Sequence, residues 1–111
     1  MAGKFELKKS ANGKFFFNLL AGNGQIVLTS EMYESKPSAL NGIESVKKNA
    51  ADAQRFEKLV NQGGKPYFVL KAGNSQVIGQ SQGYSSEAAR DAGIASVAGA
   101  ADGAATSDLT G

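Results

Sequence analysis

The chain repeats itself, and this duplication limits its possible folds more than any other feature of the sequence. Shifting the 111-residue sequence by 51 positions aligns it with itself without a gap. Over residues 4–49, 17 of the 46 aligned pairs are identical, including Phe17 with Phe68 and Tyr33 with Tyr84. The sequence therefore predicts two copies of one unit, repeat 1 at about residues 3–50 and repeat 2 at about 54–100.

Each copy has the pattern of three strands followed by one helix. The predicted strands cover residues 4–8, 15–20 and 25–29 in repeat 1, and residues 55–60, 67–71 and 76–80 in repeat 2. Glycine-containing turns such as Asn12-Gly13 separate them, as is typical of hairpins. After each third strand the apolar spacing becomes helical, and Ser35 and Ser86 stand at the expected N-cap positions.

Gly42 and Gly93 fall in the middle of the two predicted helices. A mid-helix glycine costs about 1 kcal/mol relative to alanine. Because both copies bear this cost, we expect each helix to approach the sheet so closely that a side chain would block it.

One unit of this size buries too little surface to be stable alone, and it leaves an unpaired strand edge. We therefore predict an α+β fold in which the tandem β-β-β-α(-β) units form a single, largely antiparallel sheet with two helices on one face. Residues 1–111 would form one domain, monomeric, with internal pseudo-twofold symmetry. Residues 101–111 are mostly Ala, Gly, Asp, Ser and Thr, which predicts a flexible tail.

The second strand of each copy alternates in a way that assigns its two faces. We expect one set of side chains to point toward the helices: Phe17, Leu19, Phe68 and Leu70. We expect the other set to lie on the opposite face: Phe16, Asn18, Tyr67 and Val69.

The sequence has no cysteine and no histidine. This excludes disulfides, metal sites with Cys or His ligands, and catalytic dyads or triads that use these residues. We expect no metal, no cofactor and no enzymatic activity. The apolar runs are far shorter than the roughly 20 residues of a membrane helix, so we expect no membrane span and a cytoplasmic protein. The net charge of +2 comes from scattered residues and does not predict a phosphate-binding stripe.

Three features of the sequence have some resemblance to functional sites, but a structural role is favoured for each. The Gly22-Asn23-Gly24 turn lacks the other residues of a phosphate-binding loop and is interpreted as a hairpin. Glu6 and Glu57 could pair across the symmetry axis as an acid and base, but a solvated strand face is favoured. Tyr33 and Tyr84 precede the helices and are expected to fix the loop against the sheet rather than to contact a ligand.

The aromatic second strands leave the most open question about function. Phe16, Tyr67, Val69 and Lys71, with Lys14 and Lys65 nearby, form a candidate binding face. The favoured hypothesis is a non-enzymatic module that binds a protein or peptide through the uncovered sheet face or an edge strand. The alternative is a nucleic-acid-binding module on the same face, because sheet aromatics can stack on bases.

Several motifs resemble the YegP-like family of small bacterial proteins, specifically its duplicated subfamily. They are Met-Ala-Gly-x-Phe-Glu-Leu at the start, Leu-x-Ala-Gly-Asn-Gly-x-x-x-Leu-Thr-Ser-Glu-x-Tyr at 19–33, and Gly-Ile-x-Ser-Val at 42–46 and 93–97. The resemblance covers residues 1 to about 100. It implies tandem units joined in one sheet, with possible exchange of terminal strands, and no known activity. Repeat 2 departs from the pattern at Pro66 and Gly79, the counterparts of Phe15 and Leu28.

Overall fold

The computed structural model describes residues 3–110, and Met1, Ala2 and Gly111 of the predicted domain and tail lie outside the described residues. Repeat 1 contains β1 (Lys4–Lys9), β2 (Phe15–Leu20), β3 (Ile26–Ser30) and α1 (Lys36–Asn49). A one-turn 3-10 helix, Ala53–Arg55, leads into repeat 2. Repeat 2 contains β4 (Phe56–Val60), β5 (Pro66–Lys71), β6 (Val77–Gln80), α2 (Glu87–Ala101) and a further strand, β7 (Ala105–Asp108).

All seven strands form one sheet in the order β4-β5-β6-β3-β2-β1-β7. Each repeat contributes an antiparallel meander, and the two meanders join through antiparallel pairing of β3 with β6. The pairing of β7 with β1 is parallel, which makes the sheet mixed. The predicted single, largely antiparallel sheet built from two repeats is confirmed.

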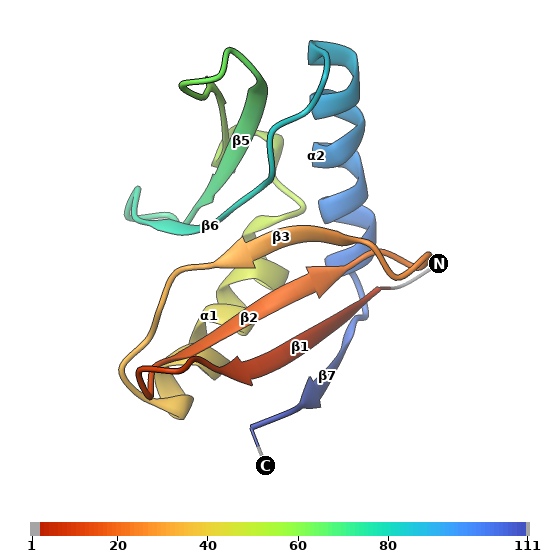
Figure 1. The fold of residues 1–111 in the computed structure, drawn as a ribbon. Helices are drawn as coiled ribbons and strands as arrows, with labels where there is room; N and C mark the ends of the chain where they lie inside the picture. The colour runs from red at the N-terminus through yellow and green to blue at the C-terminus, as the bar shows by residue number, and fades with distance from the viewer. Residues whose placement is uncertain (1–2, 111) are drawn as a thin grey trace.

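Both helices cover the same face of the sheet, and in Figure 1 α1 and the lower end of α2 lie behind β3. The fully buried core side chains on this face include the four predicted ones, Phe17, Leu19, Phe68 and Leu70, each at 0% exposure. Burying a Leu or Phe side chain contributes about 1.5–3 kcal/mol. The alternation of the second strands therefore predicted the core-facing residues correctly.

The mid-helix glycines mark the closest approach of the helices to this core. A Cβ added to Gly42 would lie 2.9 Å from the Phe17 ring and would also collide with the hydroxyl end of Tyr33. A Cβ at Gly93 would lie 3.2 Å from Phe68 and would collide with Tyr84 in the same way. The expectation of packing glycines is confirmed.

The junction between the repeats depends on an exception to the repeat pattern. Leu28 is buried at 1% exposure beside Gly79, its counterpart in repeat 2. A Cβ at Gly79 would lie 2.9 Å from the Thr29 carbonyl oxygen and 3.1 Å from Leu28. Only one of the two equivalent positions can carry a large side chain so close to the pseudo-twofold axis, which gives the departure at Gly79 a physical reason.

The helices begin where the sequence predicts. The Ser35 hydroxyl accepts a hydrogen bond from the Ser38 N–H at 3.2 Å, and the Ser86 hydroxyl accepts one from the Ala89 N–H at 3.1 Å. Each cap satisfies one backbone donor that the first helical turn leaves free.

The C-terminal segment differs from the flexible tail expected for residues 101–111. Helix α2 continues to Ala101, the first residue of the expected tail, and β7 follows it. The Leu109 N–H donates to the Leu7 carbonyl at 2.8 Å, and Lys36 pairs with Asp108 at 2.6 Å. A polar segment that buries little apolar surface gains order here because the outer edge of β1 supplies hydrogen-bond partners for its backbone.

Candidate functional site

The face of the sheet opposite the helices, called the open face below, carries the predicted binding residues. One register row crosses this face through all seven strands, and its members are Glu57, Val69, Gln80, Thr29, Asn18, Glu6 and Ser107. Side chains that are paired across strands share a face, so the row fixes which residues can act together.

Phe16 and Tyr67 occupy equivalent places on either side of this row. Phe16 is paired with Lys8 on β1, and Tyr67 is paired with Leu59 on β4. Both rings are half-buried. Strands β3 and β6 lie between them, and the antiparallel succession of strands places the rings on opposite sides of the row. The structure therefore forms two separate half-sites rather than one aromatic platform.

The other two predicted residues are a buried valine and a lysine held in an ion pair. Val69 is only 6% exposed, because its neighbours in the row, Glu57 and Gln80, flank it on both sides. The Lys71 ammonium lies 2.6 Å from a carboxylate oxygen of Glu57. What these positions offer a partner is a neutralised ion pair beside the Tyr67 half-site.

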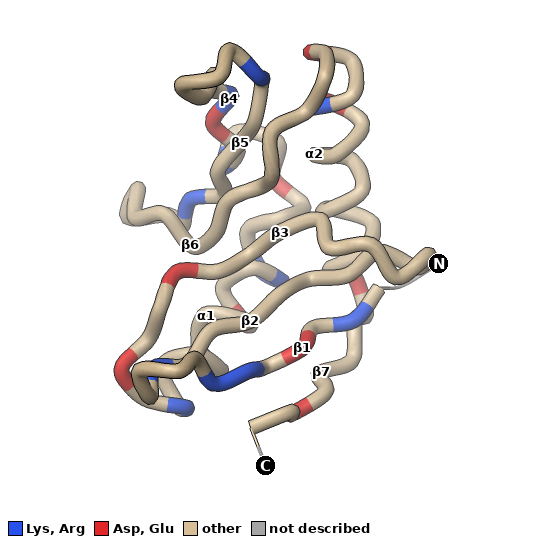
Figure 2. Tube along the Cα trace, in the orientation of Figure 1, with Lys and Arg blue, Asp and Glu red and all other residues tan. Residues whose placement is uncertain are grey.

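The lysines near the aromatic strands are also paired. On β1, Lys4 and Lys8 lie 3.6 and 3.7 Å from the two carboxylate oxygens of Glu6. Lys14 lies 3.0 Å from Glu34, and Lys65 is exposed in its turn. Figure 2 shows basic and acidic residues interleaved over both repeats. The open face thus carries charges of both signs.

The features given a structural role in the sequence keep that role. Glu6 and Glu57 lie on β1 and β4, five strand spacings of about 4.8 Å each apart, so they do not form an acid–base pair. Gly22-Asn23-Gly24 forms the hairpin between β2 and β3, with φ of +86° at Gly24. Tyr33 stacks on Phe17 at 6.2 Å between ring centroids.

Among residues 3–110, four side chains have clearly shifted pKa values. Burial raises the pKa of Tyr84 and of Tyr33, and the nearby Glu31 carboxylate adds to the shift of Tyr33. A hydrogen bond from Lys58 lowers the pKa of Asp91, and one from Lys36 lowers that of Asp108 to about 2. Each shift moves the pKa away from neutral pH, so none of them prepares a general acid or base for catalysis.

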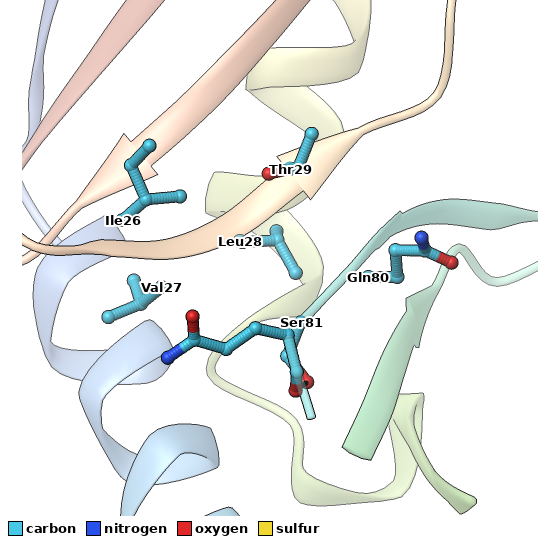
Figure 3. Close-up of a pocket in the computed structure, with 7 residues that line it drawn as sticks. Ile26, Val27, Leu28, Thr29, Gln80 and Ser81 are labelled. Atoms are coloured by element: carbon cyan, nitrogen blue, oxygen red, sulfur yellow. Dashed lines mark hydrogen bonds between the residues drawn. The ribbon is translucent and has the colours of Figure 1, made fainter. Parts of the chain in front are cut away.

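A hollow at the repeat junction was not predicted from the sequence. Strands β3 and β6 share only the pairs Thr29–Gln80 and Ser30–Gly79, and then β6 turns away. The Ser81 N–H donates to the Phe68 carbonyl, and the Ser81 hydroxyl accepts from the Phe68 N–H at 3.0 Å. The diverging strands leave a hollow of about 380 Å³ (Figure 3). It is lined by Ile26, Val27, Leu28, Thr29, Gln80, Ser81 and Gln82.

The repeat alignment contained the signal for this turn. Ser30 and Ser81 are identical in the two copies. Each hydroxyl accepts a hydrogen bond from the N–H of the core phenylalanine and donates one to the carbonyl of the next residue. The Ser30 hydroxyl accepts from the Phe17 N–H at 2.8 Å and donates to the Glu31 carbonyl. A buried serine at the end of both third strands thus marks where each strand leaves the sheet.

Residues 3–110 hold no cluster of three or more His, Cys, Asp or Glu side chains arranged to bind a metal ion. Within the same residues, no helix has the length and apolar character needed to cross a membrane.

Comparison with known proteins matches both halves of the chain to one family. The family described as "Domain of unknown function (DUF1508)" matches residues 10–57 and again residues 61–108. The chain belongs to this family. The two matches follow the duplication, and each runs from the second strand of a repeat through its helix into the strand beyond it.

Members of the family are similar to this chain over most of their length. The UPF0339 protein of Acinetobacter baylyi is 53% identical over 111 residues, 100% of both chains. The UPF0339 protein YegP of Escherichia coli K12 is 54% identical over 97 residues, 87% of this chain and 88% of that protein. The resemblance to YegP-like proteins is therefore confirmed.

Solved structures of two relatives share the fold. The solution NMR structure of E. coli yegP, described as a protein of unknown function, superposes with a TM-score of 0.94 at 50% identity. The superposition covers 100% of this chain and 96% of the yegP chain. The Shewanella oneidensis UPF0339 protein gives a TM-score of 0.92 at 53% identity, with 99% and 93% covered.

Proposed function

We propose that this protein is a non-enzymatic module that binds a protein or peptide on the open face of its sheet. The observation that carries the proposal is the symmetric pair of half-buried rings, Phe16 and Tyr67, on the face opposite both helices. Apolar groups kept at the surface of a small protein often mark contact sites. Lys71, with its Glu57 partner, would form the polar rim of the Tyr67 half-site, and Val69 would support its floor.

The titratable groups support a binding role over a catalytic one. The sequence offers no His or Cys, and the resolved pKa shifts of Tyr33, Tyr84, Asp91 and Asp108 all lead away from neutrality. An acid–base mechanism would need a group brought toward neutral pH by its surroundings.

The pairing of charges favours a protein partner over a nucleic acid. Phosphate binding draws on cations that can release counterions. On the open face Lys4, Lys8 and Lys71 already lie within 4 Å of the carboxylates of Glu6 or Glu57. A nucleic acid would have to compete with these carboxylates, whereas a polypeptide can pair with both signs.

The test is to replace both rings with serine, Phe16→Ser with Tyr67→Ser, and to compare the proteins recovered from native cell extract with and without nuclease. Leu40→Ser is a matched control, because Leu40 is an apolar residue, 42% exposed, on α1. We expect the folded double variant to lose partners that the control keeps. Full retention of partners would refute the proposal, and partners lost to nuclease or to moderate salt would favour the nucleic-acid alternative.

A further inference from the structure

The two outer edges of the sheet are not equivalent. Strand β1 is covered by β7, whereas β4 has no strand on its outer side among residues 3–110. The repeat offset of 51 aligns β7 with residues 54–57, which lead into and begin β4 itself. The segment that would cover β4 by symmetry is thus used to connect the repeats, so the edge stays unpaired within this part of the chain.

Strand β7 shows how such an edge holds an added strand. It runs parallel to β1 in a register from Lys4–Ala105 to Leu7–Asp108. The Leu7 carbonyl accepts the Leu109 N–H at 2.8 Å. The Asp108 carboxylate lies 2.6 Å from the ammonium of Lys36, the first residue of α1. Backbone pairing with β1 aligns the added strand. The ion pair with Lys36 favours an acidic residue at position 108 of that strand.

The corresponding positions around β4 carry different charges. Lys58 replaces Leu7, Glu87 replaces Lys36, Arg90 replaces Ala39 and Asp91 replaces Leu40. The anchoring charge at the start of the helix is therefore reversed. The Glu87 side chain is 78% exposed and lies 3.8 Å from Arg90, a loose contact.

Among these four charged side chains, Glu87 is the most exposed and has the longest ion-pair distance. The Lys58 ammonium is 3.2 Å from Asp91, and Arg90, only 7% exposed, is also 3.2 Å from it. Asp91 thus lies within 3.2 Å of both cations, and the four side chains Lys58, Arg90, Asp91 and Glu87 together carry no net charge that could attract an acidic residue. A strand carrying Asp at the anchor position, such as the β7 of a second copy, would meet the like charge of Glu87.

We infer that the outer edge of β4 binds an extended segment of another protein, parallel to β4, with Lys or Arg where β7 has Asp108. This is strand addition with a basic anchor against Glu87. It rests on the proposed function only in that both assign peptide binding to the molecule. The surfaces differ, because the edge presents backbone groups of β4 and the open face presents side chains.

The experiment uses two synthetic peptides with the sequence of residues 104–110, one with Asp at position 108 and one with Lys. Each is titrated into the full chain while the backbone amide signals are followed by NMR. We expect the Lys peptide to shift the amides of Phe56–Val60 and to bind about fivefold more tightly than the Asp peptide, since exposed ion pairs contribute modestly. The Glu87→Lys variant should reverse the preference.

Matched variants separate this site from others. Glu44→Lys changes the net charge equally at an exposed position of α1 and should leave the preference unchanged. The double variant Phe16→Ser, Tyr67→Ser should keep edge binding, so failure of the open-face proposal would be seen separately. Absence of shifts in β4, shifts confined to β1 and β7, or an unchanged preference in Glu87→Lys would overturn the inference.

Discussion

At the scale of single residues, the same three-residue contact occurs once in each repeat. A tyrosine stacks on the core phenylalanine of the second strand, and a mid-helix glycine leaves room for the tyrosine. The members are Tyr33, Phe17 and Gly42 in repeat 1, and Tyr84, Phe68 and Gly93 in repeat 2. The cost of a helical glycine is offset because its absent side chain lets the ring, the strand and the helix meet.

Replacing Gly93 with Leu should therefore destabilise the protein by about 1–3 kcal/mol, because the added atoms overpack the contact with Tyr84 and Phe68. The measurement is urea unfolding. Gly99→Leu is the control, since Gly99 lies in the same helix with open space around an added Cβ. Equal losses at both positions would show that packing at Gly93 is not the cause.

The two tyrosines also predict a loss of stability at alkaline pH. Burial raises the pKa of Tyr33 and Tyr84 in the folded protein above the ordinary value of about 10. Their contribution is fully present below pH of about 10 and is lost as the pH rises through the folded pKa, because the unfolded chain ionises first. Urea midpoints should fall above that pH, less so in the Tyr33→Phe, Tyr84→Phe double variant. Tyr67→Phe, a change on the open face, should behave like the parent.

At the scale of elements, β7 is ordered by its contacts with other elements rather than by burial of its own side chains. It is four residues long, and none of the four is buried. Its order depends on the backbone of β1 and on contacts at the start of α1, where Lys36 pairs with Asp108. Thr110 adds hydrogen bonds to the same carboxylate through its N–H at 3.0 Å and its hydroxyl at 2.6 Å.

This arrangement predicts an acid-sensitive docking of β7. The hydrogen bond from Lys36 lowers the pKa of Asp108 from 3.8 to about 2. The stabilisation is present above pH of about 4 and is lost as the pH falls through about 2, because protonation removes the charge that Lys36 binds. The stability difference between the parent and Asp108→Asn should shrink over this range in thermal melts. A difference that stays constant would show that the ion pair does not contribute. Asp102→Asn is the control.

At the scale of the whole molecule, the two repeats depend on each other. Helix α1 contacts β5 and β6 of repeat 2 as well as β2, and α2 contacts β1, β2 and β3 of repeat 1 as well as β5. Strands β3 and β6 close each other's edges at the pseudo-twofold axis. Each half therefore leaves an apolar surface and a strand edge exposed when it is alone.

Residues 1–52 as a separate fragment should accordingly be unfolded or dimeric, while we expect the full chain to be a folded monomer. Sedimentation equilibrium together with circular dichroism measures both properties. A folded, monomeric fragment of this length would contradict the shared core, because it would show that one meander and one helix bury enough surface by themselves.

The sequence by itself determined the repeated unit, the positions of its strands and helices, the serine caps and the packing glycines. These features follow from local patterns. The strands show a period of two, the spacing becomes helical after Ser35 and Ser86, and both copies keep a glycine in the helix despite its cost in stability. The core-facing side of β2 and β5 followed from the same alternation.

Tertiary structure alone decided the partners. It paired the polar segment Ala105–Asp108 with β1, buried Val69 between its cross-strand neighbours, and separated Phe16 from Tyr67 by two strands. It also showed that Lys36 anchors β7, and this contact identifies Glu87, the counterpart of Lys36 in repeat 2, as the candidate anchor beside β4. The physical reason is that the deciding strand pairs, β1 with β7 and β3 with β6, join segments distant in sequence, and the pseudo-twofold axis arises only when both repeats share one sheet.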